Sequence, residues 1–253
     1  MPVYALMLEF DGAPFVGWQR QAEGLSVQQV LEEAAARLNG GIPPTAIASG
    51  RTDSGVHAEA LVVQMEIARE LPPERLREAL NFHTRPHPLS VRRAALAPEG
   101  WNARFSATRR GYRYRILNRR PRPALDLGRV WHIQHRLDAV AMHAAAQGLL
   151  GRHDFSAFRA AACQAASPLR TLDRLEVSRL GEEVVILAEA RSFLHHQVRN
   201  LVGTLVQVGD GRRGVEWPRR VLQGRDRGQA GQTAPPEGLT FLFARYPQEP
   251  DWV

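Results

Sequence analysis

The 253-residue chain contains no lysine and a single cysteine, and both scarcities limit what it can do. With Cys163 alone, the chain cannot form an internal disulfide or a zinc site built from several thiolates. It also lacks an apolar run long enough to cross a membrane, a signal peptide and a lipidation signal. These absences predict a soluble, cytoplasmic protein.

All 33 basic residues are arginines, and the formal net charge is +7. Such a balance suits a polyanionic partner, and arginine binds phosphate bidentately and stacks on bases. Genomic composition bias explains most of the exchange of lysine for arginine, but it does not explain clustering. Eight arginines and no acid lie between residues 104 and 122, interleaved with aromatic residues. This pattern favours nucleic-acid binding and predicts that Arg109 and Arg110 contact phosphates.

The segment Gly50-Arg51-Thr52-Asp53-Ser54-Gly55 places a carboxylate between two glycines, just before an apolar run at 61–67. Glycines allow a sharp turn and a close approach to a ligand. The segment therefore predicts a carboxylate fixed at a strand edge and open to substrate. The alternative is an aspartate that only hydrogen-bonds its own turn.

Alternating and helical hydrophobic patterns predict an α+β protein built from two ferredoxin-like β-α-β-β-α-β halves. The first half has strands at 3–10, 44–49, 56–67 and 89–97, a helix from Ser26 with Gln29 completing a capping box, and a helix opened by Pro72-Pro73. The second has strands at 129–135, 171–180, 184–190 and 239–246, a helix capped by Asp138 with Val140, Met142 and Leu149 as its apolar residues, and a helix at 193–208.

We predict the division at 1–105 and 106–253, with strand 111–118 joining the two sheets edge to edge into one mixed, largely antiparallel sheet. A substrate cleft is expected at the junction. The irregular stretches 151–170 and 225–238 are long enough to bind something or to be mobile, and the sequence does not distinguish these alternatives.

Three further segments accompany the Asp53 motif. They are Phe10-Asp11-Gly12 with Phe15-Val16-Gly17-Trp18-Gln19-Arg20-Gln21, Ala103-Arg104-Phe105-Ser106-Ala107-Thr108 leading to Tyr112-Arg113-Tyr114, and Phe193-Leu194-His195-His196-Gln197-Val198-Arg199-Asn200-Leu201-Val202-Gly203. In motif content and order the chain resembles the TruA family of tRNA pseudouridine synthases over nearly its whole length.

The resemblance implies the pseudouridine synthase fold and a homodimer that isomerises uridines 38, 39 and 40 in the anticodon stem-loop of tRNA, without metal or cofactor. It implies Asp53 as the nucleophile, Arg199 as its cationic partner and Tyr112 as the pocket tyrosine that stacks on uracil. It also implies that Arg51 enters the RNA stack when the target base is extruded.

Each assignment has a plainer alternative. Arg199 could extend along an apolar helix face to the surface, and Tyr112 could be a core residue of an alternating strand. His57, His195 and His196 lack the i,i+4 spacing of a helical metal site, so we expect hydrogen-bonded polar groups or RNA contacts. His57 is included among the predicted substrate contacts.

Two rival functions are weaker. A non-catalytic RNA-binding protein would not need the combination of Asp53, Tyr112 and Arg199, and a metal-dependent nuclease would need several clustered acids. His135-Arg136-Leu137-Asp138 resembles the catalytic motif of RluA-type synthases, but a helical pattern follows it. We therefore predict that Asp138 is a helix N-cap.

Overall fold

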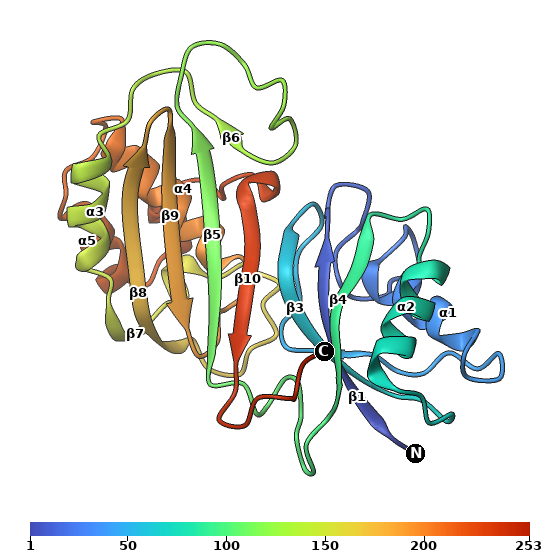
Figure 1. The fold of residues 1–253 in the computed structure, drawn as a ribbon. Coiled ribbons are helices and arrows are strands. Elements are labelled where there is room, and N and C mark those ends of the chain that lie inside the picture. Colours follow the sequence, from blue (N-terminus) through green and yellow to red (C-terminus); the bar gives the residue numbers. More distant parts are fainter. The chain divides into compact units, whose positions relative to one another are not determined.

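A computed structural model describes residues 1–253. By internal contacts the chain divides into two compact units (Figure 1). One comprises Met1–Thr108 together with Phe241–Val253, and the other comprises Arg109–Thr240. The predicted second half ran from 106 to the end, whereas residues 241–253 return to the first unit. Within that unit the Tyr246 hydroxyl donates to the Ala103 carbonyl at 2.7 Å.

The first unit follows the predicted ferredoxin-like order. Its elements are β1 (Val3–Phe10), α1 (Val27–Ala36), β2 (Ile47–Ala48), β3 (His57–Glu66), α2 (Pro73–His83) and β4 (Leu89–Leu96). The strands pair antiparallel in the order β4-β1-β3-β2. Leu6 lies opposite Val63 on one side and Ala94 on the other, and all three are buried.

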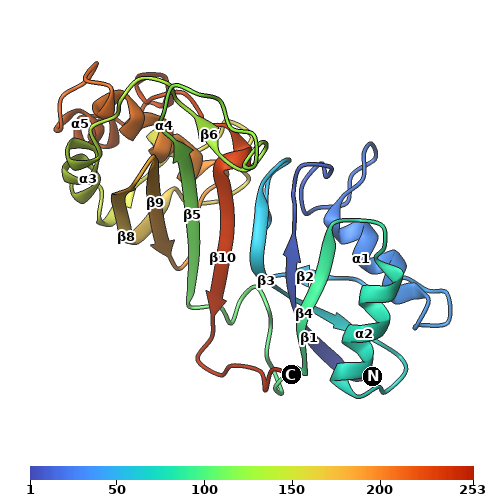
Figure 2. The same ribbon diagram turned by 45° about the horizontal axis from the view of Figure 1, so that its top comes forward.

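Helices α1 and α2 contact each other and lie on the same side of these strands (Figure 2). Helix α1 buries Val27, Leu31 and Ala35 at helical spacing, and α2 buries Leu76 and Leu80. Apolar stripes of this kind drive helices onto a sheet face.

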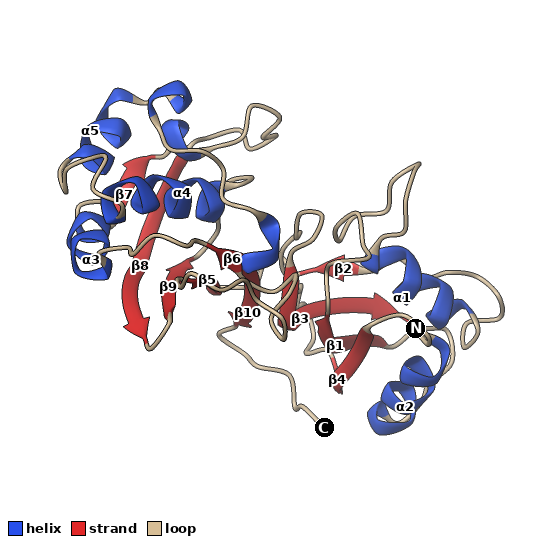
Figure 3. Cartoon of the chain, turned by 90° about the horizontal axis from the view of Figure 1, so that it is seen from above, coloured by secondary structure: helices blue, strands red, loops and turns tan.

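The second unit repeats the pattern with extra elements. They are β5 (Arg109–Leu117), β6 (Trp131–His132), α3 (Ala139–Gln147), β7 (Gly151–Asp154), β8 (Leu169–Leu180), β9 (Glu183–Ala190), α4 (Gln197–Gly209) and α5 (Trp217–Gly224), and β10 (Leu239–Arg245) begins at its end. Short 3-10 turns occupy Ser156–Phe158, Arg227–Gln229 and Pro236–Gly238. The antiparallel order is β5-β9-β8-β7, and β6 pairs parallel to β5. Figure 3 shows α3, α4 and α5 on one side of β8 and β9.

The α+β class and the mixed, largely antiparallel strand pairing are confirmed. The prediction that 129–135 forms the first strand of the second repeat is wrong. Only Trp131–His132 is a strand, and β5 takes that position, because β5-β9-β8 corresponds to β1-β3-β2 of the first unit.

Three other predictions need correction. The helix expected at 193–208 begins at Gln197, because His196 before it has a left-handed backbone, with φ of 62°. The stretch 151–170 contains β7, which pairs with β8, and helix α5 was not predicted. Val140 is 80% exposed, so it does not belong to the apolar face of α3.

The two predicted N-caps, Ser26 and Asp138, are confirmed. Ser26 Oγ accepts a hydrogen bond from the Gln29 amide at 3.1 Å, but the Gln29 side chain donates to Glu33. This is an N-cap with only half of a capping box. Asp138 Oδ1 accepts from the amides of Val140 and Ala141, both at 3.0 Å.

The helices of both units are too short or too polar to span a bilayer.

Asp138 should contribute to stability only as the N-cap of α3. Asp138→Ala removes the acceptor of two amides and is expected to lower the free energy of unfolding by about 1 kcal/mol. Urea unfolding followed by circular dichroism measures the change. Val140→Ala, on the exposed face of the same helix, is the control and should stay within about 0.5 kcal/mol of the parent. Equal stability of parent and Asp138→Ala would contradict the capping role.

Candidate active site

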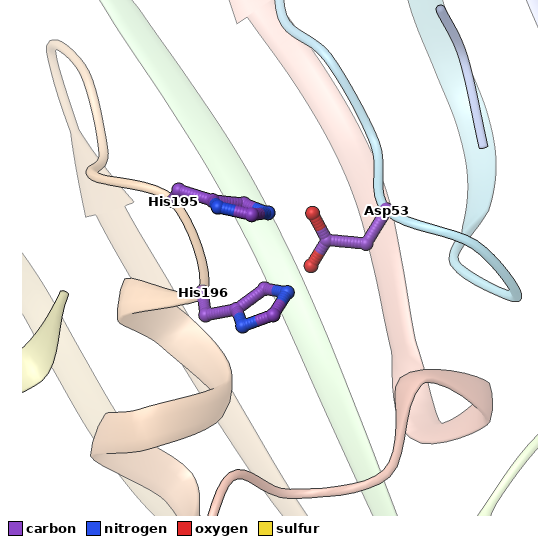
Figure 4. Close-up of side chains that lie close together, drawn as sticks. All are labelled: Asp53, His195 and His196. Carbon is purple, nitrogen blue, oxygen red and sulfur yellow. The ribbon is translucent and has the colours of Figure 1, made fainter. Parts of the chain in front are cut away.

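Asp53 lies on the turn that connects β2 to β3. Its side chain is half-buried, between buried Thr52 and exposed Ser54, and Figure 4 shows the carboxylate extending away from the chain. The Val56 amide donates to the Asp53 carbonyl at 3.2 Å and closes the turn. Gly55 has φ of +77°, a conformation that favours glycine. The backbone around Asp53 is thus set by the turn itself.

A second loop, formed by residues 11–18, packs backbone to backbone against this turn. A Cβ atom on Gly12 would lie 2.1 Å from the Val56 carbonyl oxygen, and one on Gly17 would lie 2.7 Å from that of Thr52. The Trp18 amide donates to the same Thr52 oxygen at 3.0 Å. Gly12 and Gly17 therefore help to hold the Asp53 turn. The sequence motif contained these glycines, but it did not reveal their contacts.

His57 faces the interior rather than solvent. It is 7% exposed, and its Nδ1 lies 3.0 Å from the Gly12 amide, which donates to it, and 3.1 Å from Asp11 Oδ1. This position suits support of the two packed loops, and the expected contact of His57 with substrate stays a prediction. Arg51 is exposed, so its predicted RNA contact remains open to test.

The two tyrosines of β5 have different surroundings. Tyr112 is half-buried and meets Phe193 edge to face, with ring centroids 5.2 Å apart and planes at 89°. Tyr114 is fully buried and its hydroxyl donates to the Pro235 carbonyl at 2.7 Å. Tyr114 is thus the core tyrosine of the strand, whereas Tyr112 is only half-buried.

Arg199 lies on α4 and is held by one residue of the following loop. Its Nε donates to the Ala234 carbonyl at 2.8 Å, and the Ala234 amide donates to the Arg199 carbonyl at 3.1 Å. Arg199 is half-buried, and its assignment as the cationic partner of Asp53 stays a prediction. Its charge is also close enough to Tyr114 to oppose the rise in the pKa of that hydroxyl.

His195 and His196 precede α4, and both imidazoles extend from the same turn (Figure 4). Their ring centroids are 4.0 Å apart. The left-handed backbone of His196 costs about 1–2 kcal/mol for a residue with a Cβ, and such strain occurs often at functional sites. The turn ends the extended chain after β9, so that Phe193 meets Tyr112 while Arg199 follows on the helix.

The arginine cluster at 104–122 is less available for phosphate than the sequence predicted. Arg110 is 8% exposed and donates to the Arg191 carbonyl, and Arg109 Nη1 lies 3.4 Å from Glu189 Oε2. Arg115 binds Glu183, and Arg119 binds Glu182. These acids are absent from the linear cluster and come from β9 and the hairpin turn before it. Besides Arg109, the exposed members of the cluster are Arg104, Arg120 and Arg122.

Comparison with known proteins identifies the family to which these motifs belong. The family model described as tRNA pseudouridine synthase matches residues 6–106 and 145–247. A protein of Acidiphilium cryptum (strain JF-5) named tRNA pseudouridine synthase A is 60% identical over 248 residues, or 98% of this chain and 97% of that protein. A protein of the same name from Rhodospirillum centenum (strain ATCC 51521 / SW) is 55% identical over 97% of this chain and all of its own length.

Gly17 should be intolerant of any side chain. Its φ is +109° and its Cβ would overlap backbone atoms, so Gly17→Ala is expected to cost roughly 2–5 kcal/mol of unfolding free energy. Gly40→Ala is the matched control, because Gly40 also has a positive φ but nothing within 4 Å. It should cost only about 1–2 kcal/mol. Equal costs in urea unfolding would show that the overlap with Thr52 relaxes easily.

Because of Tyr114, the free energy of unfolding should decrease at alkaline pH. Burial raises the pKa of its hydroxyl, Glu237 adds to the rise, and Arg199 opposes it. An unfolded tyrosine ionises near pH 10, so above that pH the native state holds a proton that the unfolded state has lost, and stability falls. Tyr114→Phe is expected to lose about 1 kcal/mol at pH 8 but to fall less steeply by pH 10.5. Urea unfolding at both pH values tests this, and equal slopes would contradict it.

Proposed function

We propose, on the premise that this chain belongs to the tRNA pseudouridine synthase family, that it modifies uridines 38, 39 and 40 of the tRNA anticodon stem-loop. The enzyme is an isomerase that converts uridine to pseudouridine in tRNA. The bond between uracil N1 and ribose C1′ breaks, and a bond between C5 and C1′ replaces it. C5 loses a proton and N1 gains one, so the reaction needs no oxidant or reductant.

Asp53 is the proposed nucleophile. The observation that carries this proposal is a half-buried carboxylate on a turn fixed by its own hydrogen bond and by two close-packed glycine contacts. A carboxylate held in place can form a covalent bond or accept a proton without losing orientation at the moment of reaction. No other acid in the chain combines this setting with the family motif.

Tyr112 and Arg199 are proposed to complete the catalytic set. The aromatic ring of half-buried Tyr112 is suited to stacking on the target uracil, and its hydroxyl to assisting proton removal at C5. Arg199 carries a permanent charge in a half-buried position, which favours the ionised form of a carboxylate partner. These roles follow the family resemblance and agree with the local setting of each residue.

The tRNA surface is proposed to include exposed arginines rather than the whole cluster. Arg51 is suited to entering the space left by an extruded nucleotide, and Arg104, Arg120 and Arg122 to contacting phosphates. Arg109 can contribute once it exchanges Glu189 for a phosphate. The enzyme is further proposed to be a cytoplasmic homodimer, with Asp53 in its N-terminal part and Tyr112 and Arg199 in its C-terminal part.

Asp53→Asn is expected to abolish turnover while tRNA affinity stays within a few-fold, because phosphate contacts dominate binding. Release of tritium from tRNA labelled at uracil C5 measures turnover, and filter binding measures affinity. Asp138→Asn is the matched control. It makes the same chemical change at a helix N-cap, where asparagine serves equally well, so both measurements should be unchanged.

Residual turnover of Asp53→Asn above about one hundredth of the parent rate would remove Asp53 as the nucleophile. If the parent protein binds tRNA but releases no tritium, the alternative of a non-catalytic RNA-binding protein holds. Mapping of pseudouridine in the product tests positions 38, 39 and 40 separately from catalysis.

A further inference from the structure

One face of α4 buries polar side chains that the catalytic roles above do not explain. Gln197, Asn200 and Thr204 are each no more than 1% exposed on a helix that is otherwise apolar inside. Asn200 and Thr204 are four residues apart and so share a face. A buried amide and hydroxyl need hydrogen-bond partners, since an unpaired polar group in the interior is costly.

Asn200 and Thr204 each have a partner in a segment for which the sequence predicted no regular structure. We call residues 231–238 the strap. The Gly231 amide donates to Thr204 Oγ1 at 3.0 Å, and Thr233 Oγ1 donates to Asn200 Oδ1 at 2.7 Å. A Cβ atom on Gly203 would lie 1.8 Å from the Gln232 carbonyl oxygen, so the strap backbone rests directly on the helix backbone.

Arg227 forms hydrogen bonds to both α4 and the strap. Its Nη2 donates to Asn200 Oδ1 and to Thr233 Oγ1, both at 3.0 Å, and its Nη1 donates to the Gly231 carbonyl at 2.8 Å. One guanidinium thus joins the helix to the strap at two points. Burial lowers the pKa of Arg227, but an arginine keeps its charge at any physiological pH.

The strap continues directly into the residue that holds Arg199. Ala234 exchanges two hydrogen bonds with Arg199, one of them to the guanidinium Nε. The next residue, Pro235, accepts from the Tyr114 hydroxyl, and Gly238 is so close to the Tyr114 ring that a Cβ would lie 2.6 Å from it. The strap is therefore fixed to α4 at one end and to β5 at the other, with the Arg199 contact between them.

We propose that Arg227 is a positioning residue for the isomerisation, because it locks the strap in the position from which Ala234 orients the Arg199 guanidinium. This inference rests on the proposed function, in which Arg199 belongs to the catalytic set. Arg227 itself acts only through Asn200, Thr233 and the strap backbone.

The test compares Arg227→Met with Arg220→Met. Both changes remove one positive charge, but Arg220 is exposed on α5, so the pair matches any general loss of attraction for tRNA. We expect kcat of Arg227→Met to fall about 10- to 100-fold, as for a catalytic group displaced by about an ångström. KM for tRNA should stay within a few-fold of the control. Arg227→Lys should recover part of kcat, because its ammonium can reach only some of the three acceptors.

A double-mutant cycle separates positioning from general weakening of the fold. If Arg227 acts through Arg199, adding Arg227→Met to Arg199→Met should lower kcat by less than about twofold more, whereas independent effects would multiply. Thr233→Val removes one hydroxyl at nearly constant volume and serves if Arg227→Met does not fold. It should also lower kcat, by about tenfold, without a matching change in KM.

Normal kcat in Arg227→Met, or in Thr233→Val if the former does not fold, would overturn the proposal, as would multiplicative losses in the cycle. An increase confined to KM would overturn it too, because it would make Arg227 a tRNA contact. Normal turnover of Arg199→Met would instead overturn the catalytic role of Arg199. The two failures are therefore distinguishable.

Discussion

Direct packing of backbone on backbone is the constraint on which the segments that carry Asp53 and Arg199 both depend. In the first unit, Gly12 and Gly17 let one loop contact the carbonyls of the Asp53 turn. In the second unit, Gly203 lets the strap rest on α4 beside Arg199. Flexible side chains can adjust to a change, whereas two backbones in contact can move only together. In each unit these contacts leave the segment that carries Asp53 or Arg199 little freedom to move.

Much of this fold could be predicted from periodicity and caps. The alternation in β1, the stripe of α1 and the N-caps Ser26 and Asp138 all have local physical causes, and the structure has each of them. The errors arose where residues far away in the sequence determine whether a segment forms a strand or a helix. The strand predicted at 129–135 has the right composition, but only two of its residues find a partner in β5.

The start of α4 shows a second kind of error. The apolar spacing of the segment continues back through Leu194, so periodicity extended the helix to 193. The backbone of His196 is left-handed, and the sign of a φ angle cannot be predicted from a hydrophobic pattern. Similarly, Val140 falls on helical spacing yet is exposed, because the neighbours of α3 cover only its other face.

Charge clusters in a sequence can also mislead, and the site residues show why. The arginines between 104 and 122 have no acid nearby in the chain, yet Glu182, Glu183 and Glu189 approach from β9 and its hairpin turn. Strand pairing brings opposite charges together from far apart in sequence. The resemblance implied roles for Asp53, Tyr112 and Arg199. The contacts of Gly12, Ala234 and Arg227 could not be predicted, because they join residues far apart in the sequence.

The return of Phe241–Val253 to the first unit affects how the protein can be made. The Tyr246 hydroxyl bonds Ala103, and Val253 exchanges two backbone hydrogen bonds with Ala94 on the edge strand β4. A ribosome must synthesise the whole second unit before these residues emerge. Until then, the edge of β4 in the newly synthesised first unit is uncovered. Uncovered strand edges are prone to pair with the wrong strand. A segment translated after the second unit is therefore needed to cover the β4 edge of the first unit.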